Sequence, residues 1–300
     1  MDIVLKVENM AKVGETIFAK SLATIPGGKG ANQAVASKRM GSNVYMIGKV
    51  GKDSNGDFLV STLRCDDINT DYVFRDENEP TGTAIINVNQ EGNNSIVVVA
   101  GANMKITIDE IKESYSIIED CDVLIAQFET PSEITIEAFK YAKAKGIITI
   151  LNPAPAKKID ETLLKYTDII IPNETEAYEL TGVFVEDLES SKKAAETFIK
   201  MGVNYVIITL GSKGAALITK EQAEIISAIK VNAIDTTAAG DSFIGAVSSK
   251  LGAEELSYKN LKKAIAFGNK VSSIVVQRAG AQPSIPTMKE VITIYGEDND

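Results

Sequence analysis

Short runs of β-branched residues alternate with segments of helical periodicity from about residue 120 onward. Helical patterns such as 132–145 and 190–201 separate the apolar runs at residues 123–128, 147–151, 168–171 and 205–210. Apolar strands joined by crossover helices are typical of a parallel sheet that is covered on both faces. We therefore expect an α/β fold, a three-layer Rossmann-like parallel sheet flanked by helices.

The first hundred residues carry a different pattern. Strand-like segments occur there without intervening crossover helices, at residues 3–8, 15–24, 83–88 and 95–100. Such segments favour a small antiparallel sheet, and the polar turn at 89–94 joins the last two as a hairpin. We predict a discontinuous division of the chain, with residues 25–82 and 101–300 as an α/β body and residues 2–24 and 83–100 as a β-sheet lid.

Charge and residue usage exclude several classes of function. The net charge of −10 argues against nucleic acid or an anionic membrane as the main partner. No apolar run approaches the roughly 18 residues of a membrane span, and the N-terminus lacks a signal-peptide pattern, so we expect a cytoplasmic protein. The chain has no histidine. Any catalysis must therefore rely on carboxylates, lysines and backbone dipoles rather than on a histidine base or a histidine-bound zinc.

Residues 235–243, Asp-Thr-Thr-Ala-Ala-Gly-Asp-Ser-Phe, place small residues at the start of a predicted helix with a carboxylate on each side. The unpaired amides of Ala238, Ala239 and Gly240 and the helix dipole would form an anion site suited to phosphate. Asp241, in the first turn, is placed to accept a proton from a hydroxyl that attacks this phosphate. An ordinary capped helix explains the same residues about equally well.

Further polar or glycine-rich segments follow other predicted strands. The glycine cluster at 27–33 precedes a probable helix at 31–40 and could meet a polyhydroxy ligand closely, or form a tight turn. The segment 173–176 could hold Mg²⁺ through water, or be a helix-capping box. The segment 209–214 suits a nucleotide phosphate or a hairpin turn. Glu129 could accept a sugar hydroxyl or be a solvated loop residue.

Taken together, these segments resemble the ribokinase family, within the larger PfkB group of sugar and nucleoside kinases. The resemblance runs from Asp2 nearly to the end of the chain. It rests on Gly-Gly-Lys-Gly-Ala-Asn-Gln-Ala at 27–34, Asn-Pro-Ala-Pro-Ala at 152–156, Pro-Asn-Glu-Thr-Glu at 172–176, Thr-Leu-Gly-Ser-Lys-Gly at 209–214, the segment 235–243, and Gly-Ala-Gln-Pro-Ser at 280–284.

The resemblance implies a reaction and a set of site residues. The implied reaction is ATP-dependent phosphorylation of D-ribose at its 5-hydroxyl, giving D-ribose 5-phosphate, with Mg²⁺ on the phosphates, K⁺ as activator and a homodimer formed through the lid sheet. Asp241 would be the base, and Ala238, Ala239 and Gly240 the anion hole. Ribose would contact Asp2, Gly28, Lys29, Asn32, Glu129 and Asp241. ATP would contact Asn173, Thr209, Gly211, Ser212, Gly214, Gly240 and Asn269, with Glu176 near the magnesium. K⁺ would be bound by Asp235, Thr237, Val275, Arg278, Gly280 and Ser284.

The N-terminus departs from the family pattern. Family members begin with a hydrophobic strand leading into an Asn-x-Asp sugar motif, and Met1-Asp2 matches only the end of that motif. By the resemblance this strand lies in the middle of the parallel sheet, so we expect unpaired neighbouring strands, weak sugar binding and poor stability, unless the start codon is misplaced. The alternatives are a kinase for another small sugar or a nucleoside, and a catalytically impaired sugar-binding protein.

Overall fold

The larger sheet has six strands, in the order β12-β11-β10-β9-β8-β7. The computed structural model describes residues 1–252 and 255–297. The strands are β7 (Val123–Ala126), β8 (Ile148–Leu151), β9 (Ile169–Ile170), β10 (Tyr205–Thr209), β11 (Ala215–Ile218) and β12 (Ala223–Ile226). β7 to β10 are parallel, whereas β11 and β12 return as an antiparallel meander. The predicted parallel α/β sheet is therefore confirmed.

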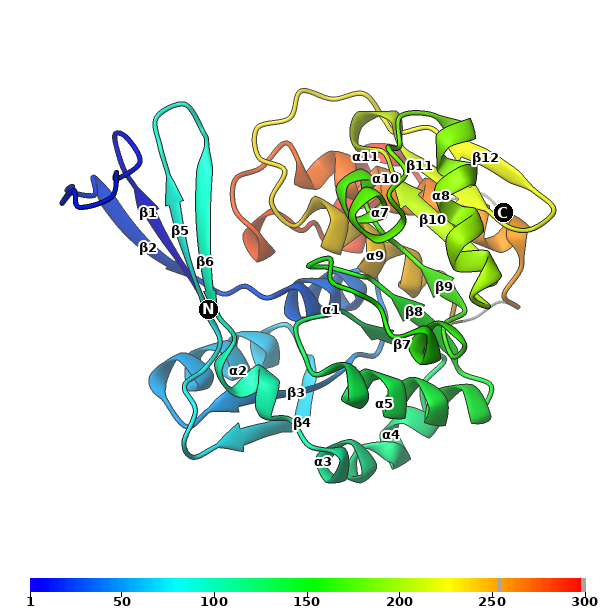
Figure 1. The fold of residues 1–300 in the computed structure, drawn as a ribbon, viewed down its shortest axis with the longest axis horizontal. Helices are drawn as coiled ribbons and strands as arrows, with labels where there is room; N and C mark the ends of the chain where they lie inside the picture. Colours follow the sequence, from blue (N-terminus) through cyan, green and yellow to red (C-terminus); the bar gives the residue numbers. More distant parts are fainter. Residues whose placement is uncertain (253–254, 298–300) are drawn as a thin grey trace.

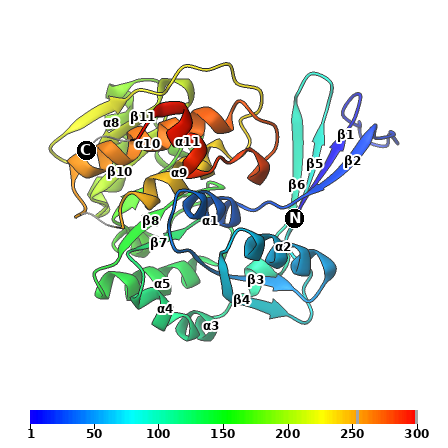
Figure 2. The same cartoon turned by 180° about the vertical axis from the view of Figure 1, so that it is seen from behind.

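Successive residues of the central strands pack against opposite helical layers. Leu151 and Ile208 belong to the core cluster with α5 (Ser132–Ala144) and α8 (Leu188–Lys200), whereas their neighbours Ile150 and Ile207 pack with α9 (Ala239–Ser249) and α10 (Tyr258–Val275). Both faces are thus apolar, which explains why these strands are continuous hydrophobic runs. Figure 2 shows α10 and the short α11 (Met288–Tyr295) on the near side of the sheet.

Two further parallel strands form a separate sheet, and the sequence patterns missed them. β3 (Tyr45–Gly51) pairs with β4 (Asn69–Asp76) through the crossover helix α2 (Ser54–Cys65). The expectation that the first hundred residues lack crossover helices is therefore wrong. Among the described residues, neither β3 nor β7 has a hydrogen-bonded strand on its other side. The two sheets still share apolar contacts, because Ile47 and Leu124 pack into the same clusters.

A four-stranded sheet projects from this body (Figure 1), in the order β2-β1-β5-β6. Its strands are β1 (Asp2–Lys6), β2 (Ser21–Ile25), β5 (Thr83–Val88) and β6 (Asn94–Val99), and β5 and β6 form the predicted hairpin. Two details of the prediction are wrong. β2 begins at Ser21 rather than at residue 15, because β1 ends at Lys6 and offers no partner before that point. β1 and β5 are parallel, so the sheet is mixed rather than antiparallel.

Short helices complete the body. They are η1 (Gly101–Lys105), α3 (Ile108–Glu113), α4 (Tyr115–Glu119), α6 (Glu161–Leu164), α7 (Glu174–Thr181), η2 (Gly211–Lys213) and η3 (Gln282–Ser284). Capping boxes begin α3 at Thr107 and α11 at Thr287, and each satisfies two backbone donors that a helix start leaves free. In the part of the chain that the structure describes, no helix is long and apolar enough to cross a membrane.

Close packing of two helices brings the N-terminal glycine cluster to the phosphate-type motif. α1 (Lys29–Arg39) lies against α9, and a Cβ at Gly245 would sit only 2.6 Å from the Ala36 Cβ and the Gln33 carbonyl oxygen. The Ser37 and Ser248 hydroxyls meet 3.3 Å apart in the same interface. Small residues thus let the two backbones approach, which fixes α1 above the first turn of α9.

Candidate active site

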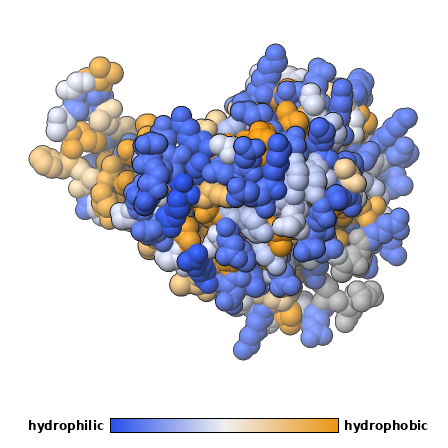
Figure 3. Space-filling view, turned by 90° about the horizontal axis from the view of Figure 1, so that it is seen from below, coloured by the Kyte–Doolittle hydropathy of each residue, from blue (hydrophilic) through white to orange (hydrophobic). Residues whose placement is uncertain are grey.

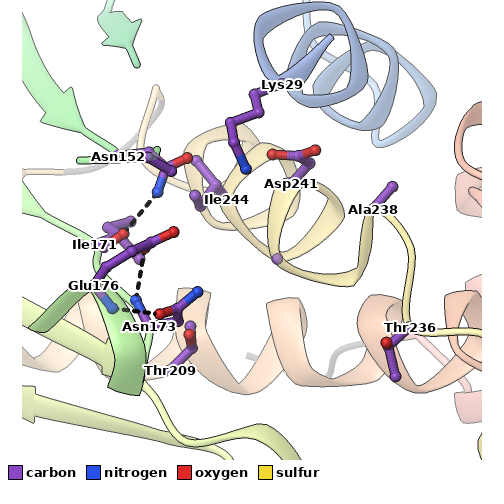
Figure 4. A pocket seen from close by; sticks show the side chains of 12 residues that line it. Lys29, Asn152, Ile171, Asn173, Glu176, Thr209, Thr236, Ala238, Asp241 and Ile244 are labelled. Atoms are coloured by element: carbon purple, nitrogen blue, oxygen red, sulfur yellow. Dashed lines mark hydrogen bonds between the residues drawn. The ribbon is translucent and has the colours of Figure 1, made fainter. Parts of the chain in front are cut away.

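A polar cavity of about 200 Å³ lies where the carboxyl ends of β8, β9 and β10 meet the N-terminus of α9. This is where open α/β sheets bind ligands. Figure 4 shows Lys29 and Asp241 on one side of it and Asn173, Glu176 and Thr209 on the other. The lining residues are Lys29, Asn152, Ala154, Ile171, Asn173, Glu176, Thr209, Thr236, Ala238, Gly240, Asp241 and Ile244.

The N-terminus of α9 faces this cavity without a side-chain cap. Its N-cap residue, Ala238, has a left-handed backbone (φ 58°, ψ 10°) and makes no side-chain capping hydrogen bond. Such a conformation costs a non-glycine residue about 1–3 kcal/mol and is concentrated at functional sites. The alternative of an ordinary capped helix is therefore wrong. The Ala239 N–H donates to the Thr236 carbonyl over 3.2 Å, and the amides of Ala238 and Gly240 are placed to meet an anion. The start and the first turn of α9 lie where the sequence predicted them.

Asp241 is buried, and hydrogen bonds hold both of its carboxylate oxygens. Asn32 Nδ2 donates to Oδ2 over 3.0 Å, and Gln33 Nε2 donates to Oδ1 over 3.1 Å. Burial raises the pKa of Asp241, and the charge of Lys29 and the two hydrogen bonds offset only part of this rise. The sequence left the direction of the shift open. The structure favours a raised pKa, because Asp241 is a buried residue, only 9% exposed.

Two more carboxylates gather near the start of α1. Glu129 Oε2 accepts a hydrogen bond from the Lys29 backbone N–H over 3.1 Å, so Glu129 is not merely a solvated loop residue. Asp2 lies against the glycine loop, where a Cβ at Gly27 would meet Asp2 Oδ2 at 2.1 Å. Burial raises the pKa of both Asp2 and Glu129, and the negative charge of Asp241 adds to both shifts. Gly28, the N-cap of α1, has φ 97°, a conformation that favours glycine.

Asn173 and Glu176 form the helix cap of one interpretation and also line the cavity. The cap is a reciprocal capping box at the start of α7, with hydrogen bonds of 2.9 and 2.8 Å. Burial raises the pKa of Glu176, against the lowering effects of the Asn173 N–H and the Lys29 charge. A partly buried carboxylate that faces the cavity is a suitable partner for hydrated Mg²⁺, which uses few protein ligands.

The segment 209–214 joins β10 to β11 as an antiparallel hairpin, as the alternative interpretation predicted. Of its residues, Thr209 lines the cavity, and Gly211, Ser212 and Gly214 follow it in the turn outside the lining. Asn269, on α10, is also absent from the lining. Its side chain is buried and donates hydrogen bonds of 3.1 Å to the carbonyls of Ile226 and Ser227. In this structure Asn269 therefore anchors the strand end of β12.

The predicted cation loop has two halves joined by Asp235. Asp235 Oδ1 accepts hydrogen bonds from the Thr237 N–H and hydroxyl, and Oδ2 accepts one of 2.8 Å from the Gly280 N–H. Burial works to raise the pKa of Asp235, but these hydrogen bonds outweigh it and lower the pKa. Val275 and Arg278 meet in a backbone hydrogen bond of 3.0 Å, and Ser284 is fully buried. An ionised carboxylate is a suitable ligand for a cation, but here both Asp235 oxygens accept hydrogen bonds from the protein.

Several polar residues of this site were missed as site residues. Gln33 and Gln127 contact each other beside Asp241, and Asn152 accepts a hydrogen bond from Gln33. Asn152 follows β8 directly, so its position at a strand end was the available signal. Gln33 had no such signal, because its burial depends on the packing of α1 against α9.

Comparison with known proteins shows the family of this chain. The model of the pfkB family of carbohydrate kinases matches residues 1–288. The chain is 46% identical over 292 residues to ribokinase from Staphylococcus aureus (strain COL), covering 97% of this chain and 95% of that protein. It is 41% identical over 291 residues to ribokinase from Haemophilus influenzae (strain ATCC 51907 / DSM 11121 / KW20 / Rd), covering 97% and 94%.

A solved structure of Arabidopsis thaliana ribokinase complexed with ribose and ATP superposes with a TM-score of 0.89 at 34% identity. The match covers 98% of this chain and 95% of that one. Family match, sequence identity and fold together assign the class of protein. The chain belongs to the pfkB family of carbohydrate kinases.

Proposed function

We propose that this chain transfers the γ-phosphate of ATP to the 5-hydroxyl of D-ribose. The observation that carries the proposal is the position of Asp241. Its buried carboxylate lies in the first, uncapped turn of α9, beside Lys29 and in one cavity with Asn173, Glu176 and Thr209. The relatives named ribokinase, and the relative whose structure holds ribose and ATP, support the choice of substrates.

Asp241 is the proposed general base. Its carboxylate would take the proton of the sugar 5-hydroxyl while the hydroxyl oxygen bonds to the γ-phosphorus. The bond from this phosphorus to the oxygen it shares with the β-phosphate breaks, and ADP leaves with that oxygen. The amides of Ala238 and Gly240, and that of Ala239 once it leaves the Thr236 carbonyl, would stabilise the charge on the transferring group. Asp2, Gly28, Asn32 and Glu129 are proposed to hold the sugar.

The nucleotide and magnesium would occupy the other side of the cavity. Asn173, Thr209 and the turn with Gly211, Ser212 and Gly214 are proposed to hold ATP, whereas Asn269 would act by fixing the end of β12. Glu176 would hold Mg²⁺, through water, and the ion supplies charge neutralisation on the phosphates when bound. Within residues 1–252 and 255–297, no group of three or more acidic or cysteine side chains forms a metal cluster, which fits an ion held mainly by phosphate and water.

The rate should depend on pH through raised carboxyl pKa values. Burial raises the pKa of Asp241, so turnover should fall, as pH decreases, at a higher pH than the value of about 3.9 for an ordinary aspartate would give. The same groups should make the folded chain less stable as pH rises, because burial raises the pKa values of Asp2, Glu129 and Asp241 in the folded state. Their contribution to the free energy of unfolding is complete below the unfolded-state pKa values and is lost as pH rises through the folded-state values. Profiles of kcat against pH test the first effect, and a flat profile down to pH 4 would contradict it.

Potassium activation is the second expected property. Asp235 ties Thr237 to Gly280 beside the start of α9, and with Val275, Arg278 and Ser284 these residues are the proposed K⁺ ligands. The unaltered chain is expected to turn over faster in K⁺ than in Na⁺. In the Asp235→Ala chain the two turnover rates should become equal. Asp109→Asn is the control, because it removes the charge of a side chain that is 91% exposed on α3. It should keep the K⁺-to-Na⁺ ratio of the unaltered chain. An equal ratio in the Asp235→Ala chain and the control would contradict the site.

The projecting sheet is the proposed lid, and its apolar surface is the proposed dimer interface. Leu22, Ile96, Val97, Val98 and Val99 are 48–67% exposed, and Figure 3 shows apolar side chains gathered on the projecting part. An exposed apolar patch of this kind marks an interaction site. Light scattering should give the mass of two chains, and Val98→Lys should give one. Val13→Lys, at a more exposed valine outside the strands (108% against 67% for Val98), should leave the dimer intact. A monomeric unaltered chain would contradict the interface.

A panel of sugars tests the proposed reaction. ADP release should require ATP and Mg²⁺ and should be fastest with D-ribose among ribose, 2-deoxyribose, fructose and nucleosides. Release with another sugar or a nucleoside, and none with ribose, would favour the alternative kinase. Ribose binding to a folded chain without ADP release would favour a sugar-binding protein. The proposed cytoplasmic location rests on the sequence alone.

A further inference from the structure

We propose that Gln33 is a positioning residue that holds the base Asp241 in its reactive orientation and keeps it deprotonated. The inference deepens the proposed function and rests on it. Gln33 lies in the first half of α1, only 1% exposed, and its side chain points to the first turn of α9 rather than to the ligand space. It is absent from the residues that line the cavity.

Every polar atom of the Gln33 side chain is used inside the protein. Nε2 donates both to Asp241 Oδ1 (3.1 Å) and to Asn152 Oδ1 (3.0 Å), and Oε1 accepts from Gln127 Nε2. Asn152 in turn donates to the Ile171 carbonyl over 3.0 Å. The network therefore ties the base to the ends of β7, β8 and β9. A buried amide held at both ends has one orientation, here with one N–H toward the Asp241 carboxylate and the other toward Asn152.

The neighbouring residue Asn32 provides a contrast. Asn32 Nδ2 donates to Asp241 Oδ2, but Asn32 Oδ1 is buried without a hydrogen-bond partner in the described structure. A buried unpaired acceptor is costly and is suited to a ligand hydroxyl. Asn32 thus keeps a free oxygen for substrate, whereas both N–H groups of Gln33 are already occupied. Neither amide lines the cavity in this structure, so the difference in role rests on the unpaired oxygen of Asn32 and on the fully used side chain of Gln33.

Positioning matters here because the surroundings of Asp241 oppose its charge. Besides Lys29, the charged groups that interact with the Asp241 carboxylate are the acids Asp2, Glu129 and Glu176. Among the described residues, Gln33 and Asn32 are the two side chains that donate hydrogen bonds to Asp241 and so favour its ionised form. The hydrogen bond from Gln33 also fixes the direction in which the carboxylate faces the sugar hydroxyl. Small errors in this direction reduce the rate strongly.

Two substitutions test the role. Gln33→Met keeps the length of the side chain but removes the donor, and should lower kcat about 10- to 100-fold, the usual worth of one hydrogen bond to a charged group. The KM values for ribose and ATP should change less than about threefold, because Gln33 touches neither ligand. Gln33→Glu is nearly isosteric and places a second carboxyl beside Asp241. It should move the acid limb of the kcat profile to higher pH.

Ser37→Ala is the matched control. Ser37 lies one turn further along α1, also buried, and bonds only to Ser248 in the same interface. It should keep kcat within about twofold. If folded Gln33→Met has the kcat of this control, or if the Gln33→Glu profile does not move, Gln33 has no positioning role. If Gln33→Met does not fold, Gln33→Glu decides by the same profile. No turnover of ribose by the unaltered chain would instead reject the proposed function on which the inference rests.

Discussion

Replacement of Asp241 by Asn should lower kcat for ribose about 10²- to 10⁴-fold, the range that a general base contributes. The amide is nearly isosteric and can still accept the hydrogen bond from Asn32 or Gln33, but it cannot take a proton at neutral pH. Ribose affinity, measured by calorimetry without ATP, should change by only a few-fold, because Asp2, Glu129 and the glycine loop remain in place. The comparison requires equal melting temperatures for both chains.

Asp109→Asn serves as the control for loss of one negative charge, since its side chain is 91% exposed on α3. It should retain full turnover. If Asp241→Asn keeps kcat within about threefold of this control, Asp241 is not the base, whatever its position in the cavity.

The largest expected effect on stability comes from Gly245→Val in the interface between α1 and α9. The Cβ alone would lie 2.6 Å from the Gln33 carbonyl oxygen and 2.8 Å from the Ser37 backbone nitrogen. Backbone atoms cannot move aside as side chains do, so the free energy of unfolding should fall by about 3 kcal/mol or more. That is a large part of a typical total of about 5–15 kcal/mol. Urea denaturation, read as the midpoint at constant slope, measures it.

Ser249→Val, on the same helix but partly exposed, controls for placing a β-branched residue in α9. The free energy of unfolding of the Ser249→Val chain should fall by only a few tenths of a kcal/mol. Equal midpoints for the two variants would contradict the close approach of α1 and α9, and with it the route by which Gln33 reaches Asp241.

The hydrophobic pattern of the sequence was sufficient to predict the strands that are buried on both faces. The runs at 147–151 and 205–210 became β8 and β10, because a strand buried on both faces is apolar at every position. The start of α9 was also predictable, since small residues and an acidic first turn precede its apolar stripe. β3 and β4 were missed, because glycine and charged residues interrupt their patterns.

The finer chemistry of the site depends on contacts between distant segments. The pKa of Asp241 follows from burial beneath α1, 208 residues away from Gln33 in sequence. The anchoring role of Asn269 follows from its contact with the end of β12, 43 residues earlier. The parallel pairing of β1 with β5 depends on a connection through the body. Such contacts have no local signature, so only the fold reveals them.

The position of the transferred phosphate tests the central claim most directly. ³¹P–¹H correlation NMR of the products from D-ribose, ATP and Mg²⁺ should show a phosphate ester coupled to the C5 protons of the sugar. The same mixture with the Asp241→Asn chain should show almost none. An ester on another carbon, or no ester from the folded unaltered chain, would contradict the account.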